Sequence, residues 1–282
     1  MTKVAVLLSG QLRDWKTVSK IFKLWNYANN EISYDFFLST WDDSYRGVYS
    51  KDADLSMCVA SEVILCEDFL LADTEVLKYS YLLKRTNILK NRYEKEQNIK
   101  YDAVIATRPD VMFGFNLLDE IRHNIKAKNL GQRTLFIHDG IADSFIPNTN
   151  EHAFYMMDFF VYGHSMAVNE YAKMYDDIMD GKLLNKIHIT PATHIVNNRI
   201  NNRASVGFAA IIRFTNVQLL EDMYNSRELQ KLMKNGYESR IFEENYLIGL
   251  NKYRREKNKY RTELEEAQSL AQKAARDNNN LI

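Results

Sequence analysis

The sequence predicts an α/β fold in which helices cover both faces of a mostly parallel β-sheet. Short apolar runs, such as residues 3–8 and 103–106, are typical of strands that are buried on both faces of a parallel sheet. Longer segments with apolar residues at helical spacing separate these runs. Strands and helices of ordinary length that alternate in this way are typical of a Rossmann-like sheet.

The predicted elements of the amino-terminal half alternate regularly. Strands are expected at residues 3–8, 34–38, 61–65 and 103–106, and helices at residues 14–29 and 73–97. The first strand is apolar almost throughout (KVAVLL), which suits a central position in the sheet. The long helix carries apolar residues at helical spacing, from Val76 to Tyr93. Residues 39–43 are expected to form a loop at the carboxyl end of the second strand.

The pattern continues less regularly after residue 113. Helices are expected at residues 117–126, 165–179 and 191–200, and strands at residues 134–137 and within 206–215. Pro191 suits the first turn of its helix, because that turn needs no backbone donor at this position. Residues 140–151 are polar and rich in turn formers, which favours a mobile loop over a site.

The composition limits the domain plan and the classes of partner. The chain has 282 residues, of which 46% are hydrophobic and 26% are charged, enough for a full-sized core. We expect one α/β domain over residues 1–220 and a helical extension over residues 221–282. Lys and Arg together number 37, as do Asp and Glu, and this zero formal charge argues against non-specific binding of nucleic acid.

The sequence also predicts a cytoplasmic location. The first apolar run is too short for a signal peptide, and no run reaches the length of a membrane span. Cys58 and Cys66 lie in or near an apolar strand-like run and are interpreted as buried thiols in a reducing compartment. A disulfide between these two cysteines is the alternative.

The carboxyl-terminal extension has a heptad pattern. Residues at intervals of three and four form one seam: Leu250, Tyr253, Lys257, Tyr260, Leu264, Ala267, Ala271 and Ala274. This pattern predicts a two-helix coiled coil, and therefore a homodimer, in which Glu256 and Arg261 pair between parallel chains. The alternative is a single helix that packs back on the globular domain.

The segment YDAVIATRPDVMF, residues 101–113, is the centre of the predicted site. Its apolar strand ends at Pro109, because proline cannot continue a hydrogen-bonded ladder. Arg108 and Asp110 are therefore expected at the carboxyl edge of the sheet, where ligands bind in open α/β folds. A carboxylate there suits a metal ion or a hydroxyl group. The alternative is a surface ion pair at a strand end.

Two other strand ends carry candidate binding residues. Ser9, Gly10, Gln11 and Arg13 follow the first strand and precede a helix, a geometry that presents backbone amides to an anion. Arg13 could add a bidentate contact with phosphate. After the second strand, Trp41 could stack on a base while Asp42 or Asp43 accepts from a sugar hydroxyl. The alternatives are an ordinary strand-to-helix turn, a core tryptophan and turn-capping aspartates.

Asp158 is the remaining acidic candidate. It lies between Met157 and Phe159, and a carboxylate in such apolar surroundings is paired, caps a turn or has a raised pKa. His188 and His194 are six residues apart, which is not a zinc-binding spacing, so we interpret both as ordinary polar residues. The spacing of residues reveals no Ser–His–Asp or Cys–His arrangement.

Five segments in this order resemble a known family: LLSGQLRDW, FFLSTWDD, YDAVIATRPDVMF, DFFVYGHSMAVNEY and ITPATHIVNNRI. The family is the GT-A-like nucleotide-sugar glycosyltransferases of bacterial surface-polysaccharide clusters and of large viruses and phages. The resemblance covers about residues 4–200. It implies a GT-A-type sheet and the transfer of a sugar from a nucleotide-sugar donor to a hydroxyl acceptor, such as a glycan.

The resemblance also implies roles for the strand-end residues. Ser9, Gly10, Gln11 and Arg13 would line the nucleotide diphosphate, and Thr40, Trp41 and Asp42 its nucleoside side. Arg108 and Asp110 occupy the place of the acidic metal-binding motif, but Arg108 replaces the first carboxylate. Asp110 is then the one carboxylate ligand for Mn²⁺ or Mg²⁺, or Arg108 acts as a fixed cation; the sequence leaves both open.

Asp158 matches an aspartate of the family and would bind the acceptor or act as general base. The helix at Pro191 departs from the family, because Ala192 stands where relatives often have glutamate. A competing hypothesis is a catalytically inactive GT-A-like scaffold that assembles through its carboxyl-terminal helix. A third is a nucleotidyltransferase, although the Lys/Gly-rich triphosphate loop that such enzymes favour does not follow Leu8.

Overall fold

The computed structural model describes most of the first 213 residues. The described residues are 1–12, 15, 18–19, 22–23, 31–42, 53–65, 75–112, 115–138, 142–145, 152–155, 160–183, 189–205 and 212–213. All of them belong to the unit Met1–Val217. The heptad pattern, and with it the predicted extension over residues 221–282, lies outside the described residues.

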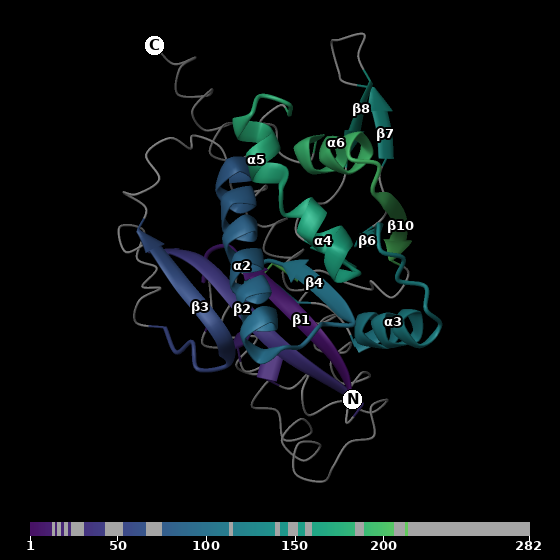
Figure 1. The fold of residues 1–282 in the computed structure, drawn as a ribbon. Coiled ribbons are helices and arrows are strands. Elements are labelled where there is room, and N and C mark those ends of the chain that lie inside the picture. Colours follow the sequence, from purple (N-terminus) through teal and green to yellow (C-terminus); the bar gives the residue numbers. More distant parts are fainter. Residues whose placement is uncertain are drawn as a thin grey trace, which may run out of the picture. The chain divides into compact units, whose positions relative to one another are not determined.

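A seven-stranded sheet forms the centre of the described structure (Figure 1). Its strand order is β10-β6-β9-β4-β1-β2-β3. These strands are β1 (Thr2–Ser9), β2 (Ile32–Asp42), β3 (Cys58–Leu65), β4 (Ala103–Thr107), β6 (Thr134–His138), β9 (Phe160–Gly163) and β10 (Asn201–Ser205). β1 pairs in parallel with β2 and β4, β2 with β3, and β6 with β10. Only β9 runs antiparallel to its neighbours, β4 and β6. The predicted α/β, mostly parallel fold is confirmed.

The order of the strands reverses beside β1. From β1 the chain adds β2 and β3 on one side and then returns to place β4 on the other side of β1. The carboxyl ends of β1 and β4 therefore flank the point at which the strand order changes direction. Ligands of open α/β sheets bind outside such a point.

Helices cover both faces of the sheet, as predicted. On one face lie α2 (Glu75–Gln97), which contacts β1 and β2, and α4 (Ser165–Tyr171), which contacts β4 and β9. The helices α5 (Met174–Met179) and α6 (Ile189–Asn197) continue this layer. On the other face, the Phe22 ring lies 5.6 Å from the Phe36 ring of β2. The helix α3 (Phe115–Lys126) reaches the same face, because Asn124 donates to the hydroxyl of Tyr162 in β9.

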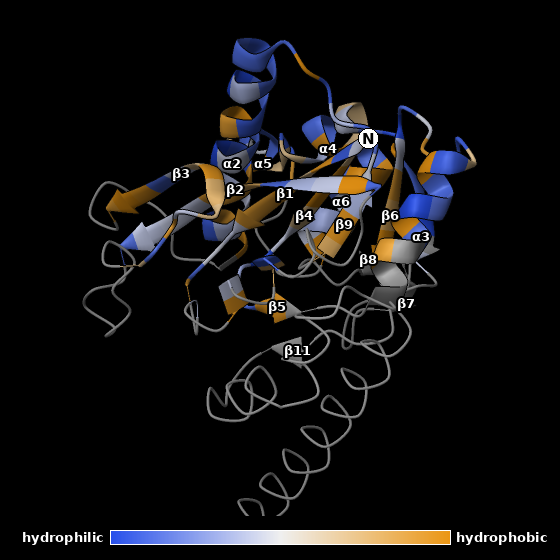
Figure 2. Ribbon diagram, turned by 90° about the horizontal axis from the view of Figure 1, so that it is seen from below, coloured by the Kyte–Doolittle hydropathy of each residue, from blue (hydrophilic) through white to orange (hydrophobic). Residues whose placement is uncertain are grey.

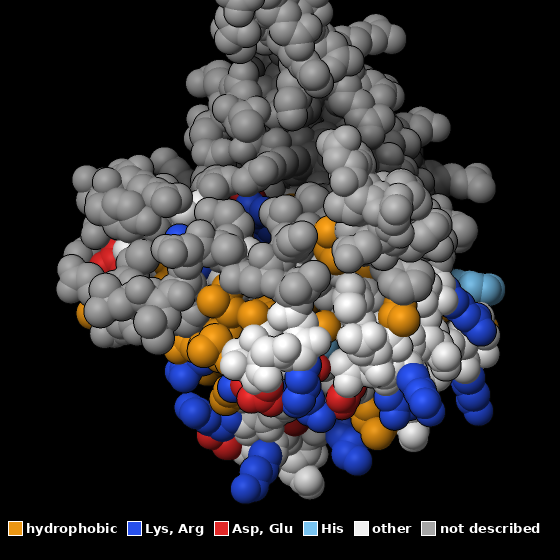
Figure 3. Space-filling model, turned by 90° about the horizontal axis from the view of Figure 1, so that it is seen from above, with side chains coloured by type: hydrophobic (Ala, Val, Ile, Leu, Met, Phe, Trp, Pro, Cys, Tyr) orange, Lys and Arg blue, Asp and Glu red, His pale blue; other side chains and the backbone are white. Residues whose placement is uncertain are grey.

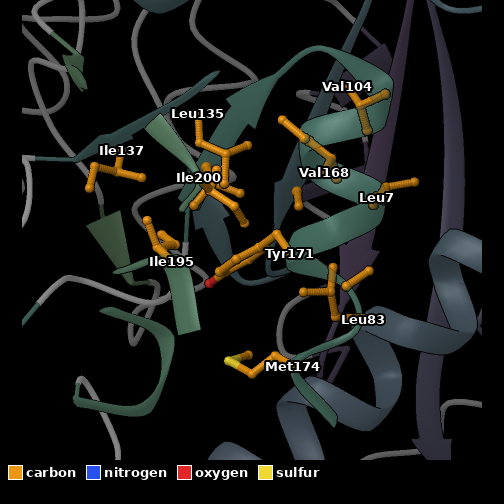
Figure 4. Packing of buried hydrophobic residues seen from close by; sticks show 14 of the residues in the cluster. Leu7, Leu83, Val104, Leu135, Ile137, Val168, Tyr171, Met174, Ile195 and Ile200 are labelled. Carbon is orange, nitrogen blue, oxygen red and sulfur yellow. The ribbon is translucent and has the colours of Figure 1, made fainter. Parts of the chain in front are cut away.

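The main core lies between the sheet and the α2–α4 layer. Figure 4 shows Leu7, Val104, Val168 and Tyr171 pointing into one cluster, all without solvent exposure. Each such aliphatic side chain stabilises the fold by about 1.5–3 kcal/mol when fully buried. Figure 2 shows hydrophobic residues on β6 and β9, whereas the outer side of α3 is hydrophilic. On the face in Figure 3, acidic and basic side chains are interspersed over the described residues.

Several expectations about local structure were wrong. Residues 39–42 do not form a loop: β2 continues through Asp42, whose partner in β3 is Leu65. Residues 165–179 form two helices with a break at Ala172 and Lys173. In the segment 140–151, residues 142–145 form a strand, β7 (Ala142–Phe145), which pairs with β8 (His152–Tyr155). By contrast, a strand is present within residues 206–215, as expected: β11 (Ile212–Arg213) pairs with β5 (Val111–Met112).

The remaining general predictions concern cysteine and membranes. Cys58 is a free thiol in β3, as predicted, but it is only half-buried; this burial raises its pKa to about 12. Cys66 lies outside the described residues. None of the described helices combines the length and the apolar character that a membrane span requires.

Candidate functional site

The candidate site lies where β1, β2 and β4 end side by side. Ser9 is the partner of Ser39 in β2, and Leu8 is the partner of Thr107 in β4. The residues that follow these strands therefore leave the sheet at the same edge. This is the edge at which the strand order reverses, so the topology brings the predicted residues to the predicted place.

Gly10 packs directly against the segment that follows β4. Its φ angle is +148°, a conformation that other residues rarely adopt, and its N–H donates to the carbonyl of Ser39 at 3.3 Å. A β-carbon at position 10 would lie 3.2 Å from Cδ of Pro109 and 3.8 Å from Cγ of Arg108. The turn at residue 10 and the Arg108 segment are thus in contact, although ninety-eight residues separate them in sequence.

Arg108 and Asp110 form a bidentate ion pair. The Nε and Nη2 atoms of Arg108 donate to the two carboxylate oxygens of Asp110 at 2.8 and 2.7 Å. The Asp110 side chain is fully buried, whereas 24% of the Arg108 side chain is exposed. The carboxylate therefore fixes the plane of a guanidinium that reaches the surface. Such a fixed guanidinium matches the geometry of phosphate oxygens.

The described residues do not form a metal site. Among them there is no group of three or more His, Cys, Asp or Glu side chains that could hold an ion. Both oxygens of Asp110 already accept from Arg108, which competes with coordination of a hard cation. The role of Asp110 as a metal ligand stays a prediction. The ion pair between Arg108 and Asp110 forms without a metal ion.

Ser9 faces helix α2. Its hydroxyl is 2.9 Å from the hydroxyl of Thr86, and both groups are buried. Because Thr86 donates its own proton to the carbonyl of Leu82, Ser9 is the donor to Thr86. The Ser9 side chain thus ties the end of β1 to α2, which leaves contacts with a diphosphate to the backbone of this turn.

The end of β2 is also tied to α2, through Glu62 of β3. Ser39 donates to Glu62 at 2.8 Å, and Arg85 forms a bidentate pair with the same carboxylate at 3.0 and 2.7 Å. Burial would raise the pKa of Glu62, but the hydrogen bonds from Arg85 and Ser39 outweigh it and hold that pKa below its ordinary value. A charged carboxylate therefore links three neighbouring elements beneath the site.

The three predicted nucleoside-side residues lie within β2. Trp41 is 4% exposed, and its indole stacks on the ring of Tyr81 with a centroid distance of 5.7 Å and an angle of 16°. This matches the interpretation of Trp41 as a packing residue. Thr40 and Asp42 are buried, and the Thr40 hydroxyl is 3.4 Å from the carbonyl of Trp41. Their proposed contacts with a nucleoside stay predictions.

Three predicted residues lie outside the described part of the chain: Arg13, Asp43 and Asp158. Gln11 is described and is partly exposed at the turn after β1. The structure thus brings together Gly10, Arg108 and Asp110, with the end of β2 beside them. It does not test the assignment of Asp158 as base.

No family model and no curated protein matches this chain. Among solved structures, the galactosyltransferase LgtC in complex with donor and acceptor sugar analogues is similar over 84% of this chain and 82% of its own. The identity is 11% and the TM-score is 0.37. The cytidylyltransferase IspD of Francisella tularensis, which acts on 2-C-methyl-D-erythritol 4-phosphate, is similar over 78% of this chain and 97% of its own. Here the identity is 10% and the TM-score is 0.36. Neither similarity is high enough to carry an argument about this chain.

Sequence reasoning missed the residues of α2 that support the site. Tyr81, Arg85 and Thr86 each contact a residue at or beside the end of β1 or β2. The sequence feature that could have pointed to them is the presence of Arg85 and Thr86 in the long amphipathic helix. Their partners could not be deduced, because the register between α2 and the strands is a tertiary property.

Proposed function

We propose that this protein is a glycosyltransferase that moves a sugar from a nucleotide-sugar donor to a hydroxyl acceptor. The observation that carries the proposal is the contact between the Gly10 turn and the Arg108–Asp110 pair at the point of strand reversal. The order of the five family-like segments supports the same assignment. Fold alone does not identify a function, so the proposal depends on these side chains.

The first requirement of the reaction is to bind and neutralise the leaving diphosphate. The missing side chain of Gly10 lets Pro109 pack against this turn, which places the turn beside the Arg108 segment at the proposed diphosphate site. In the proposal, the guanidinium of Arg108 donates to the diphosphate while Asp110 keeps it in the required plane. A cation that is fixed before the reaction stabilises the developing charge without reorganisation. Asp110 is then a positioning residue and Arg108 the group that touches the donor.

The proposal uses Arg108 in place of a divalent metal ion. The resemblance implies Mn²⁺ or Mg²⁺, which would add further positive charge at the diphosphate. The resemblance assigns Asp110 as the carboxylate ligand of such an ion, but this carboxylate already pairs with Arg108. Turnover that is unchanged by chelation of divalent metals is therefore expected.

The second requirement is to activate the acceptor hydroxyl. Asp158 is proposed to accept the proton if the reaction inverts the sugar, or to orient the acceptor if it retains the configuration. A conservative Asp158→Asn substitution removes the basic oxygen with little change in volume. It should abolish transfer while donor binding is retained.

A donor-hydrolysis screen over common nucleotide sugars tests this function. Release of the free nucleoside diphosphate is measured for the wild type and for Arg108→Ala and Asp158→Asn, with exposed Lys95→Ala as control. At least one donor should be hydrolysed by the wild type and the control, and both site variants should fail. Absence of turnover with every donor, in the presence and absence of Mn²⁺, contradicts the proposed activity.

A second candidate is a non-catalytic binding or scaffold protein. It is favoured by the basic Arg108 where the family has its first carboxylate. This candidate predicts that a nucleoside diphosphate raises the melting temperature without turnover.

Assembly through the predicted coiled coil is tested by deleting residues 251–282. A change from two chains per particle to one supports the homodimer, and a single chain per particle before and after the deletion supports the packed-back helix.

A further inference from the structure

A polar pocket lies at the opposite edge of the sheet from the Gly10 turn. Its cavity volume is about 650 Å³, within the range of small-molecule sites. β4 and β6 begin at this edge, and the antiparallel β9 ends there, so His164 and Ser165 are delivered beside Tyr101. The last turns of α2 supply Glu94, and the turn after α3 supplies Lys128.

The buried Lys90 determines which hydrogen-bonding groups the pocket presents. Its side chain is fully buried, and its ammonium group donates to the Ser165 hydroxyl at 2.5 Å and to the Asn169 carbonyl oxygen at 3.1 Å. Lysine has donors only, so these two lining residues are held as its acceptors. The groups that they retain are the hydroxyl hydrogen of Ser165 and the amide hydrogens of Asn169, which are donors.

His164 also has an acceptor that is engaged within the protein. Its Nδ1 atom accepts from the backbone N–H of Met166 at 3.1 Å. The neutral imidazole therefore carries its proton on Nε2 and is a donor at that atom. Three neighbouring lining residues, His164, Ser165 and Asn169, thus each have one acceptor engaged within the protein and retain a donor.

The charged side chains of the pocket also favour a ligand that accepts hydrogen bonds. Of its two carboxylates, Glu94 accepts from the N–H of Tyr101 and pairs with Lys90, and Asp102 accepts from the N–H of Lys3. Lys100 and Lys128 line the pocket and are exposed. Neither lysine ammonium has a hydrogen bond or ion pair to any residue of the described ranges. Each carboxylate thus accepts a backbone hydrogen bond, and Asp102, like the two lysines, is exposed.

We propose that this pocket binds a small polyhydroxylated anion, of about the size of a sugar phosphate, through its phosphate or carboxylate group. Lys100 and Lys128 supply the charge, and the donors of His164, Ser165 and Asn169 bind oxygen atoms of the ligand. Charge-assisted hydrogen bonds of this kind are stronger than neutral ones. The site is separate from the Gly10 edge and does not depend on the proposed glycosyltransferase function.

Met166 provides a local probe, because it lines the pocket and is 53% exposed. The full chain is labelled at its methionine methyl groups, and the Met166 resonance is identified by its loss in Met166→Leu. Hexose 6-phosphate, hexuronate and the neutral hexose are titrated separately. A shift with one or both anions but not with the neutral sugar supports the proposal and distinguishes phosphate from carboxylate recognition. No movement of the Met166 resonance with either anion at about 10 mM, well above a typical metabolite Kd, overturns it.

A charge-reversal pair tests whether the two lysines are responsible. In Lys100→Glu/Lys128→Glu, both changes are at exposed positions, so the fold should be retained, and the other methionine resonances report on this. Affinity for the anion should fall by about tenfold or more. The exposed Lys95→Glu, on α2 but not lining the pocket, is the matched control and should bind as the wild type does. Unchanged affinity in the double variant overturns the proposal.

Discussion

Gly10 and Pro109 are in contact across the boundary between β1 and β4, so closely that a β-carbon at residue 10 would lie 3.2 Å from the proline ring. This distance is tighter than most contacts of real β-carbons. The glycine therefore has two reasons to be at this position: its φ angle of +148° and the proximity of the neighbouring segment. Gly10 and Pro109 both lie at the edge of the sheet that we assign to donor binding.

Substitution of Gly10 by alanine should destabilise the protein and weaken nucleotide binding. Strained backbone and the close contact together should cost about 3 kcal/mol in the free energy of unfolding. The measurement is urea denaturation, followed by titration with a nucleoside diphosphate.

Gly181→Ala is the matched control for this prediction. Gly181 also has a positive φ, +71°, but no atom lies within 4 Å of the position of a β-carbon. Its substitution should cost only about 1–2 kcal/mol and leave nucleotide binding unchanged. Equal costs at the two positions would show that the Pro109 contact has no energetic weight.

Asp110→Asn should weaken nucleotide binding although it removes a negative charge. If Asp110 acts by orienting Arg108, its neutral variant loses one of the two hydrogen bonds that hold the guanidinium. Nucleoside diphosphate affinity should then fall by about tenfold, as in Arg108→Lys, which keeps the charge but loses the planar fork. A stability loss of about 2–3 kcal/mol is also expected, because the carboxylate is fully buried.

The sign of the Asp110→Asn effect decides between two roles. A carboxylate that merely lies near an anion repels it, so its neutralisation would tighten binding. Calorimetric titration of the two single variants measures this directly. Tighter binding by Asp110→Asn would rule out the orienting role.

Glu62→Gln should destabilise the protein by about 1 kcal/mol, because the charged link between Ser39 and Arg85 is lost. Arg85 is partly exposed, which limits the cost. Thermal or urea unfolding measures the effect, with Glu96→Gln, at an exposed position of α2, as control. Indistinguishable stability of the two variants would remove Glu62 from the account of how the end of β2 is held.

Acidification below neutral pH should destabilise the fold through His194. Burial lowers the pKa of this fully buried residue, and the contacts of its ring with the Glu170 carbonyl and the Asp177 carboxylate offset the effect only in part. The unfolded chain therefore takes up a proton near pH 6.5, whereas the folded chain does so only at lower pH. Stability is present above about pH 6.5 and is lost as the pH falls through the lower folded pKa.

Urea denaturation at pH 7.5 and pH 5.5 tests the His194 prediction. The loss of stability between the two pH values should be smaller in His194→Gln than in the wild type, and unchanged in the exposed His123→Gln. Asp177, which also pairs with Lys182, has a lowered pKa, but its contribution appears only near and below pH 4. An equal loss in the wild type and His194→Gln would assign the effect to other groups.

The parts of the fold that sequence could predict are those in which local and tertiary preferences agree. β1 and β4 are apolar because both of their faces are buried, and Pro109 ends β4 because it cannot donate to the sheet. The residue pattern of these two segments is therefore sufficient to infer that Gly10 and Arg108 share an edge. Gly10 was expected to bind an anion; the structure shows that Pro109 is the group packed against it, and the contact with an anion stays a prediction.

The features that were missed depend on neighbours distant in sequence. The sequence of residues 39–42, STWD, is typical of a polar loop. It does not show that Ser39 binds Glu62 or that Trp41 stacks on Tyr81, the contacts that keep these residues in β2. β10 carries Asn201, Asn202 and Arg203, which are exposed, so no apolar pattern marks it as a strand. The break between α4 and α5 contains neither proline nor glycine.

Hydrogen exchange upon donor binding is the most direct test of the central claim. The nucleotide sugar that stabilises the protein most is added at saturation, and amide exchange is compared with that of the free protein. The account predicts protection in peptides that contain residues 8–12 and 107–111, with no change at residues 164–169. Protection confined to other segments, or none in these two, would contradict the placement of the donor between Gly10 and Arg108.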